Sequence, residues 1–367
     1  MHPRVSVSGL CFPGLSATDA IEAIAGLGAA NASITGAKAR ASGAGPVVAA
    51  ARRHGVRIVT TTGALGLDLS SAEASDASRR RAEQDIDLAA AVGATVMYGL
   101  TGPRTSARWD ASADAYVNAV AQLASYAAER GVRLAIEPTS WLYSDLTFVH
   151  TFHDALLVAP RAGMGICLDA FHVWTEAGLR EEIAAHAGLI AHVQLSDMTP
   201  GSRALPCRAV PGDGDVPLAT VVQWLFEAGY PGVFDCELNG PAIDAIGHHA
   251  AAARAASWLD KLLAELGGPG KPDPRGTNQD YLVIRLRASL TVPLAPERLE
   301  ISCPTAHRDR PRATGWGRPT CGSSGTLRSR SSPWTARRPG TRSRRRCTSA
   351  SATRSAGWTR TRSLRAC

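Results

Sequence analysis

The sequence predicts an α/β fold, a closed (β/α)8 barrel over residues 1–268 that is followed by a disordered Arg-rich tail. Short apolar runs alternate eight times with longer, Ala-rich stretches of helical periodicity. The apolar runs are nearly continuous, which is typical of parallel strands covered by helices. The eighth unit ends near Gly267, and eight strand–helix units in about 265 residues fit a closed barrel.

Eight segments are predicted as strands because each is a short apolar run bounded by turn-forming residues. In chain order they span residues 5–10, 30–35, 57–62, 95–100, 133–137, 163–169, 190–195 and 232–238. A doubly wound open sheet is the alternative arrangement. No GxGxxG motif follows the first strand, and this favours the closed barrel.

The intervening segments are predicted as helices because their apolar residues recur three and four positions apart. They span residues 17–27, 46–54, 72–92, 111–130, 152–159, 176–187, 218–228 and 242–266. Ser16 and Asp110 are the predicted N-caps of two of these helices. Glycines stand where five of them should stop, at Gly28, Gly55, Gly93, Gly131 and Gly229.

Charge is divided unevenly along the chain, whose 367 residues carry a formal net charge of +8. Residues 271–367 hold 21 Lys and Arg against 5 Asp and Glu, whereas residues 1–270 hold 19 basic and 27 acidic residues. The barrel region is therefore acidic. The basic character that would suggest a nucleic-acid partner belongs to the tail.

The composition excludes membrane-spanning and secreted classes of protein. No run of about 18 apolar residues occurs, and the N-terminus lacks the charged and apolar regions of a signal peptide. The eight cysteines are scattered singly, without a CxxC pair. We therefore expect a cytoplasmic protein with reduced cysteines and no membrane partner.

The C-terminal part differs in composition from the barrel. Residues 269–300 are predicted to form a Pro/Gly-rich linker with a short appended element, and residues 301–367 contain 16 Arg, no Lys and one acidic residue. This composition buries too little apolar surface to offset the entropy of ordering, so we expect disorder. The tail is either a nucleic-acid-binding arm or the product of a frameshift beyond the true C-terminus. The absence of Lys and of periodicity favours the frameshift.

Polar residues end the last four predicted strands, where the functional groups of a barrel project. They occur in the segments LAIEP, GICLDAFH, AHVQLSD and FDCELNG and are Glu137, Asp169, Gln194 and Glu237. Three carboxylates at one barrel mouth would repel one another, so the pattern favours a divalent metal. Ion pairs with barrel arginines are the alternative for Glu137 and Glu237, and a hydrogen-bonding core amide is the alternative for Gln194.

The ordered set IEP, LDxxH, HVQxSD, RxxPGDGD and CEL resembles the sugar phosphate isomerase/epimerase family, whose fold is a xylose-isomerase-like TIM barrel. The resemblance covers roughly residues 4–266. It implies that Glu137, Asp169, Gln194 and Glu237 ligate one divalent metal. Many members have His where Gln194 stands, and the hydroxypyruvate-isomerase branch is similar to this sequence in having Gln. A donor set made only of oxygens favours Mn²⁺ or Mg²⁺ over Co²⁺ or Zn²⁺.

The resemblance also implies a reaction, in which a proton moves through a metal-bound enediolate. Glu137 would remove the proton and Glu237 would return it, giving epimerisation or aldose–ketose isomerisation. The expected substrate is a small sugar, ketose, polyol or hydroxy-keto acid. Related barrels often pair, so a homo-oligomer is possible, but the sequence itself does not determine the oligomeric state.

Five further residues are candidates for substrate binding, each with a structural alternative. His172 matches the DxxH motif, and Arg208 offers a guanidinium for a phosphate or carboxylate, although each could be a solvated loop residue. Asp197 follows its strand and could contact the substrate or cap the loop. Trp141 and Trp174 follow strand-end acids, where they could stack on a sugar or pack within loops.

Three other functions remain open on the same sequence. An inosose-type dehydratase, which is a lyase, resembles the same template and could use the same metal and bases. A metal endonuclease of the abasic-site type would need more histidines at strand ends than the sequence offers. A nucleic-acid-binding protein that acts through the tail is the non-enzymatic alternative.

Overall fold

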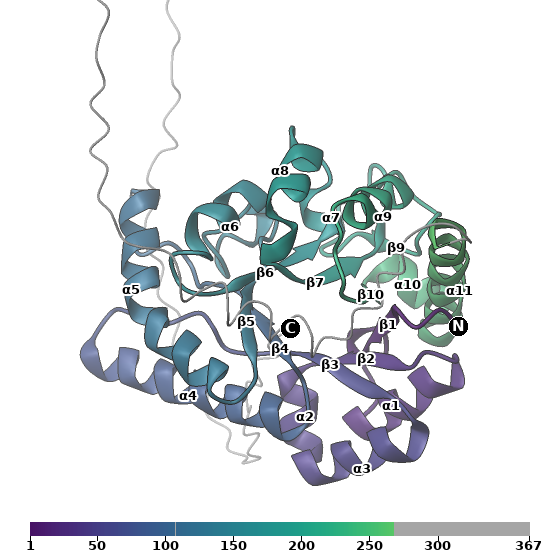
Figure 1. Ribbon diagram of the computed structural model, residues 1–367, viewed down its shortest axis with the longest axis horizontal. Helices are drawn as coiled ribbons and strands as arrows, with labels where there is room; N and C mark the ends of the chain where they lie inside the picture. Colours follow the sequence, from purple (N-terminus) through teal and green to yellow (C-terminus); the bar gives the residue numbers. More distant parts are fainter. Residues whose placement is uncertain (107, 268–367) are drawn as a thin grey trace, which may run out of the picture. The chain divides into compact units, whose positions relative to one another are not determined.

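Eight parallel strands form a closed barrel in the computed structural model, which describes residues 1–106 and 108–267 (Figure 1). The ring order is β1, β10, β7, β6, β5, β4, β3 and β2. The strands are β1 (Val5–Ser8), β2 (Asn31–Ile34), β3 (Arg57–Thr62), β4 (Val96–Gly99), β5 (Arg133–Ile136), β6 (Gly165–Asp169), β7 (Ile190–Leu195) and β10 (Phe234–Cys236). The predicted fold class is confirmed. The predicted linker, residues 269–300, and the basic tail, residues 301–367, lie outside the described residues.

The register of the strands brings the predicted strand-end residues to one edge of the barrel. Asp169 of β6 lies opposite Gln194 of β7, and Gln194 lies opposite Asp235 of β10. Parallel pairing places the carboxyl ends of all eight strands at the same mouth. An antiparallel pair, β8 (Asp197–Met198) and β9 (Arg208–Ala209), stands apart from the barrel sheet.

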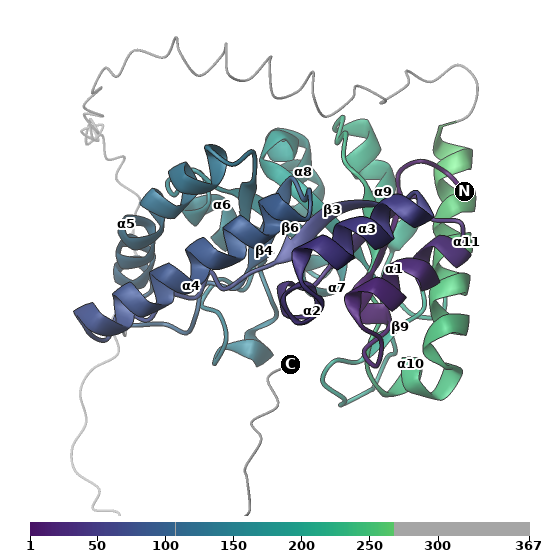
Figure 2. The same cartoon turned by 90° about the horizontal axis from the view of Figure 1, so that it is seen from below.

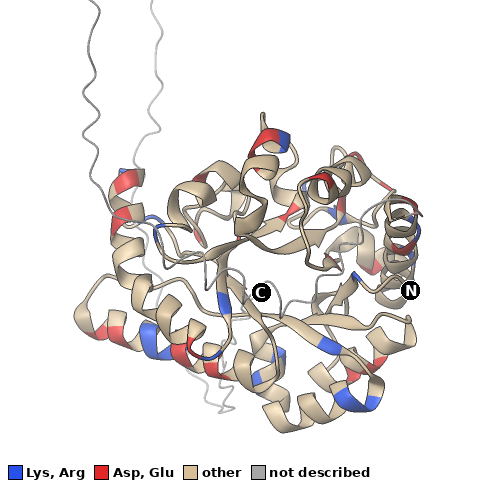
Figure 3. Ribbon diagram, in the orientation of Figure 1, with Lys and Arg blue, Asp and Glu red and all other residues tan. Residues whose placement is uncertain are grey.

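Helices cover the outside of the barrel, and α1 packs against α3 as α4 does against α5 (Figures 1 and 2). Their bounds are α1 (Ala17–Gly26), α2 (Gly36–Ser42), α3 (Ala44–His54), α4 (Ala72–Ala91), α5 (Trp109–Ala128), α6 (Phe152–Val158), α7 (Ala170–Val173), α8 (Leu179–His186), α9 (Leu218–Glu227), α10 (Pro241–Ile246) and α11 (His248–Leu266). Short 3-10 turns occur at Gly9–Cys11, Trp141–Tyr143 and Ala187–Leu189. Lysines, arginines and acidic residues lie mainly on these helices (Figure 3).

Several predicted helix boundaries were wrong. The sequence prediction missed α2, which Thr35 caps by accepting a hydrogen bond from the backbone N–H of Lys38. The predicted last helix is two helices, because Gly247 has φ 90 and the chain turns there. Ser16 is the N-cap of α1, as predicted. Asp110 is not a cap, because α5 begins at Trp109, two residues before the predicted start, and Arg108 is at its N-cap.

The apolar core lies between the barrel and its helices, whereas the barrel interior is largely polar. Asp235 is fully buried there and accepts hydrogen bonds from Ser6 at 2.6 Å and Ser33 at 2.5 Å. Nδ1 of His192 lies 3.1 Å from the Thr60 hydroxyl. A small apolar cluster of Tyr98, Ala135 and Cys167 completes the interior.

The cysteines of the described chain, Cys11, Cys167, Cys207 and Cys236, are free thiols, and three of them are buried. Burial raises the pKa of Cys167 and Cys236 well above the ordinary value. These two thiols therefore remain protonated at neutral pH. Within residues 1–106 and 108–267, no helix has the length and apolar character needed to cross a membrane.

Candidate metal centre at the barrel mouth

Three carboxylates lie at the carboxyl end of the barrel. Asp169 ends β6, while Glu137 and Glu237 directly follow β5 and β10. Their exposed fractions are 9% for Glu137, 0% for Asp169 and 5% for Glu237. Oxygens of Glu137 and Asp169 and a ring nitrogen of His172 lie within 4.8 Å of one another. The structure thus brings together the acids that the sequence predicted at the strand ends.

Arg208 of β9 is buried within this group of carboxylates. Its Nη2 lies 2.7 Å from Asp169 Oδ2 and 3.0 Å from Glu237 Oε1. Its Nη1 donates to the hydroxyl of Ser196 at 2.7 Å, and the guanidinium lies 4.4 Å from the centroid of the Phe171 ring. Arg208 is only 4% exposed, so it is a component of the mouth rather than a solvated loop residue.

The three carboxylates differ in electrostatic environment. Burial opposes the ionisation of Asp169, but the Arg208 guanidinium and His172 hold the pKa of Asp169 below its ordinary value. Burial raises the pKa of Glu237 to about 7, although Arg208 opposes that shift. Burial and the negative charges of Glu237 and Asp169 raise the pKa of Glu137 well above its ordinary value.

The donor set fits a divalent cation. Within the described residues, the carboxylate of Glu137 makes neither a hydrogen bond nor an ion pair. Glu137, Asp169, Glu237 and Arg208 carry a net charge of −2 when all four are ionised, which a divalent cation would neutralise. Carboxylate oxygens are hard donors, suited to Mg²⁺ or Mn²⁺.

Gln194 contacts the Glu237 carboxylate through its amide nitrogen. The Cys167 thiol donates to the amide oxygen at 2.9 Å, while the nitrogen donates to the Tyr98 hydroxyl at 2.8 Å and to Oε2 of Glu237. The Tyr98 hydroxyl also donates to Glu237 Oε2 at 3.3 Å. Every donor in this network faces an acceptor. The network therefore places the amide nitrogen of Gln194, and not its oxygen, against Glu237.

His172 lies beside the carboxylates at the end of the short helix α7. The backbone N–H of Ser140 donates to its Nδ1 at 3.3 Å, and its Nε2 lies 3.6 Å from Asp169 Oδ2. Burial lowers the pKa of His172 to about 4, despite the opposing charge of Asp169. The imidazole is therefore neutral at pH 7 with its proton on Nε2, which is a hydrogen-bond donor at the mouth.

A known family accounts for this arrangement of barrel and strand-end acids. A family model described as a xylose isomerase-like TIM barrel matches residues 19–262. The chain belongs to this family. The resemblance on which the sequence prediction depended is thereby confirmed. A search of curated proteins finds no match to this sequence.

Several solved structures resemble this chain at low sequence identity. Protein SMc04130 from Sinorhizobium meliloti 1021 has a TM-score of 0.64 and 21% identity, over 71% of this chain and 98% of that chain. The IOLI protein with a bound zinc atom has a TM-score of 0.64 and 15% identity, over 72% and 99%. D-psicose 3-epimerase from Clostridium cellulolyticum H10, solved with D-tagatose, has a TM-score of 0.60 and 14% identity, over 72% and 99%.

Asp197 organises the loop that closes one side of this xylose isomerase-like barrel. Its buried carboxylate accepts backbone hydrogen bonds, each of 2.9 Å, from Met198, Gly212 and Val216. A Cβ on Gly214 would collide with the Asp197 carboxylate and the Met198 carbonyl, so this turn requires glycine. Both oxygens of Asp197 therefore hold the PGDGD loop.

The two predicted tryptophans lie in different surroundings. Trp141, in the 3-10 turn after β5, is 71% exposed, and it is the neighbouring Tyr143 whose ring packs against His172 at 5.7 Å. Trp174 is half-buried and packs against the apolar core. Neither tryptophan has a hydrogen bond to the carboxylates in the described part of the chain.

Sequence reasoning missed four residues that surround the site of this xylose isomerase-like protein. They are Tyr98, Cys167, Ser196 and Asp235. A period of two along the strands was the available signal, because Cys167, Ser196 and Asp235 lie two residues from Asp169, Gln194 and Glu237. Tyr98 carried no such signal, because its strand, β4, has no acidic residue at its end from which to count back. The strand-end acids occur only from β5 onward.

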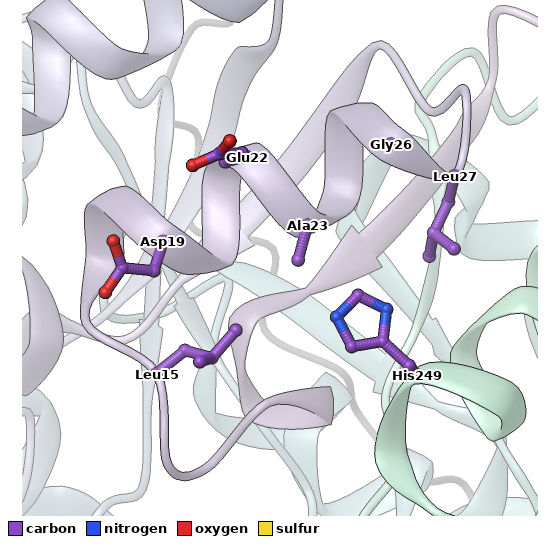
Figure 4. A pocket seen from close by; sticks show the side chains of 7 residues that line it. All are labelled: Leu15, Asp19, Glu22, Ala23, Gly26, Leu27 and His249. Carbon is purple, nitrogen blue, oxygen red and sulfur yellow. The ribbon is translucent and has the colours of Figure 1, made fainter.

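Two hollows lie on the outside of the xylose isomerase-like barrel, apart from the carboxylates. One, of about 390 Å³, lies between α1 and α11, where His249 faces Ala23 and Leu27 (Figure 4). The other, of about 510 Å³, lies between the PGDGD loop and α11 and includes Arg254 and Trp258. None of the strand-end carboxylates lines either hollow.

Proposed function

We propose that this protein is a divalent-metal-dependent isomerase or epimerase of a small sugar, ketose, polyol or hydroxy-keto acid. The observation that carries the proposal is the convergence of three buried carboxylates at the barrel mouth, one of which, that of Glu137, makes neither a hydrogen bond nor an ion pair with any described residue. Membership of the xylose isomerase-like family supports it, as do neighbours of the fold that include a sugar epimerase.

The metal would be held by Glu137, Asp169 and Glu237. The donor chemistry favours Mn²⁺ or Mg²⁺, while the zinc in the IOLI structure keeps Zn²⁺ and Co²⁺ as alternatives. As found, Gln194 offers its nitrogen to Glu237, so ligation by its oxygen would require the amide to turn away from Cys167. Polarisation of a substrate carbonyl is the chemistry that a bound divalent cation would supply.

Glu137 and Glu237 are proposed to move the proton. They follow β5 and β10, which are separated in the ring by β6 and β7, so the two carboxylates approach the mouth from different sides. One such carboxylate can remove a proton from a bound carbon. The other can return a proton to the opposite face of that carbon, which gives epimerisation, or to the neighbouring carbon, which gives isomerisation. The pKa of Glu237, which burial raises to about 7, makes this residue a usable acid as well as a base near neutral pH, and burial raises the pKa of Glu137 in the same direction.

Substrate oxygens would meet hydrogen-bond donors at the same mouth. The neutral imidazole of His172 presents an Nε2–H group there, and Arg208 adds a guanidinium. Trp141 and Trp174 remain proposed as pocket walls. The Asp197 carboxylate is fully engaged with the PGDGD loop, so its part in substrate binding would be to fix the loop that precedes α9 and follows Arg208.

Metal analysis combined with solvent-deuterium exchange tests this proposal. We expect the wild type to bind about one Mn²⁺ per chain and to exchange deuterium into at least one ketose or hydroxy-keto acid of a panel. Glu237→Gln and Glu137→Gln should lose exchange by at least about 100-fold, whereas the exposed Glu129→Gln should not. An absence of bound metal and of exchange in the wild type would refute the proposal. Release of water from the substrate would instead assign the site to a lyase.

A further inference from the structure

Arg208 contacts a carboxylate oxygen of Asp169 and one of Glu237 at the proposed metal site. Nη2 of Arg208 contacts Asp169 Oδ2 and Glu237 Oε1 at 2.7 and 3.0 Å. One nitrogen thus bridges carboxylates from β6 and from the end of β10. This bridging is also what the proposed divalent cation would have to do.

The remaining oxygens of the same two carboxylates are engaged elsewhere. Asp169 Oδ1 accepts a hydrogen bond from the backbone N–H of Phe171 at 3.0 Å. Glu237 Oε2 accepts from Gln194 and from Tyr98. A cation that ligates both Asp169 and Glu237 therefore meets Arg208 at Asp169 Oδ2 and Glu237 Oε1.

Arg208 is carried by an element that is separate from the barrel wall. It belongs to the β8–β9 pair, so a shift of this side chain would break no hydrogen bond between barrel strands. Its Nε is buried and has no hydrogen-bond partner among the described residues. The guanidinium is thus incompletely satisfied where it stands, and it retains a donor for another acceptor.

We propose that Arg208 is a built-in competitor of the divalent metal, the resident counter-ion of the metal-free site. The inference rests on the proposed metal site. Without metal, Arg208 neutralises part of the charge of the buried carboxylates and holds Asp169 and Glu237 together. When a metal binds Asp169 or Glu237 through these oxygens, Arg208 must release the one that is bound, and its positive charge then repels the cation at short range. The metal affinity of the wild type is therefore lower than the carboxylates alone would give.

Calorimetric titration of metal-free protein with Mn²⁺ tests the competition without any assay of activity. Arg208→Met removes the charge and keeps an unbranched side chain, and we expect it to bind Mn²⁺ at least about ten-fold more tightly than the wild type. Arg208→Lys keeps the charge but loses the planar fork, and its affinity should lie between the two. Arg203→Met, an exposed arginine of the same loop, is the matched control and should bind as the wild type does.

Thermal unfolding supplies a second readout that does not depend on the affinity measurement. The metal-free Arg208→Met protein should melt at a lower temperature than the metal-free wild type, because its carboxylates lack a counter-ion. Saturating Mn²⁺ should then raise its melting temperature by more than it raises that of the wild type. If Arg208→Met unfolds without metal, Arg208→Lys provides the same comparison.

The outcomes separate this inference from the proposed function. If the wild type binds Mn²⁺ and Arg208→Met binds it equally or more weakly, the competition is refuted while the metal site stands. If neither protein binds Mn²⁺, both proposals fail. Tighter binding by Arg208→Met with an unchanged Arg203→Met supports the competition.

Discussion

The backbone N–H of Ser140 donates to Nδ1 of His172, and this contact fixes the tautomer of the imidazole. With Nδ1 accepting, the proton of the neutral ring lies on Nε2, which faces the Asp169 carboxylate at 3.6 Å. A nitrogen that carries a proton cannot ligate a metal. Although His172 lies within reach of the carboxylates, the structure thus favours a donor over a ligand.

The tautomer of His172 gives a first prediction. In ¹⁵N-labelled protein, long-range proton–nitrogen correlation should show His172 with Nε2–H before and after addition of Zn²⁺. His153, an exposed histidine whose Nδ1 lies 2.7 Å from Glu182 Oε1, serves as the reference for a ring with the proton on Nδ1. A loss of the Nε2 proton at His172 on metal addition would make it a ligand and contradict the prediction.

Gln194 and Glu137 should differ in their effect on metal binding. Because Gln194 faces Glu237 with its nitrogen, Gln194→Ala should weaken Mn²⁺ binding by no more than about three-fold, whereas Glu137→Gln, which replaces a charged oxygen donor, should weaken it by about 100-fold or more. Gln194→His should shift the preference toward Zn²⁺ or Co²⁺. Calorimetric titration of each variant measures both effects. Equal losses for Gln194→Ala and Glu137→Gln would show that the amide is a full ligand.

Asp197 should matter for stability more than its neighbours on the loop. Its buried carboxylate accepts three backbone hydrogen bonds, so Asp197→Asn, whose amide can accept through only one atom, should lower the free energy of unfolding by about 1–3 kcal/mol. Asp213→Asn, at a partly exposed residue of the same loop, is the control. Urea unfolding measures both. An equal effect of the two variants would show that the buried carboxylate has no special role.

Glu176 should make stability depend on pH. Both of its oxygens accept from the backbone N–H of Phe152, at 2.8 and 2.9 Å, and burial raises the pKa of Glu176 to about 7, from an ordinary 4.5. The folded state therefore holds this proton more tightly than the unfolded chain. The resulting stability is complete below about pH 4.5 and is lost as the pH rises through 7.

The comparison of wild type with Glu176→Gln isolates this effect. Between pH 5 and pH 8 the wild type should lose about 1 kcal/mol relative to the variant, less than the full shift implies because Glu176 is partly in water. Urea unfolding at both pH values measures the difference, and Glu129→Gln controls for a change in surface charge. A difference between wild type and Glu176→Gln that stays constant with pH would show that Glu176 titrates normally.

The sequence predicted the strands and their terminal acids because both depend on local pattern. An apolar strand that ends in Glu137, Asp169 or Glu237 is recognisable wherever the chain goes next, and parallel pairing then brings the ends together. The bounds of the helices were less predictable. The start of α5 and the break at Gly247 depend on how each end packs and caps.

The position of Arg208 could not be predicted in the same way. It comes from a two-residue strand in a long connection, and its burial depends on that connection folding back over the barrel mouth. The same holds for Gln194, since the orientation of its amide follows from Cys167 and Tyr98 on two other strands. Contacts between segments distant in the sequence determine the burial of Arg208 and the orientation of the Gln194 amide. No residue spacing in the sequence predicts these contacts.

The hydrogen bonds of Asp235 to Ser6 and Ser33 have a consequence for how the barrel closes. They join β10 to β1 and β2, the strands at which the last strand meets the first. A barrel of eight strands has a fixed stagger, and sliding β10 by two residues would keep its side chains facing inward. Such a slide would carry Glu237 into the place of Asp235 and empty the mouth of one carboxylate. The buried aspartate thus fixes the register of β10, and with it the height at which Glu237 stands in the barrel mouth.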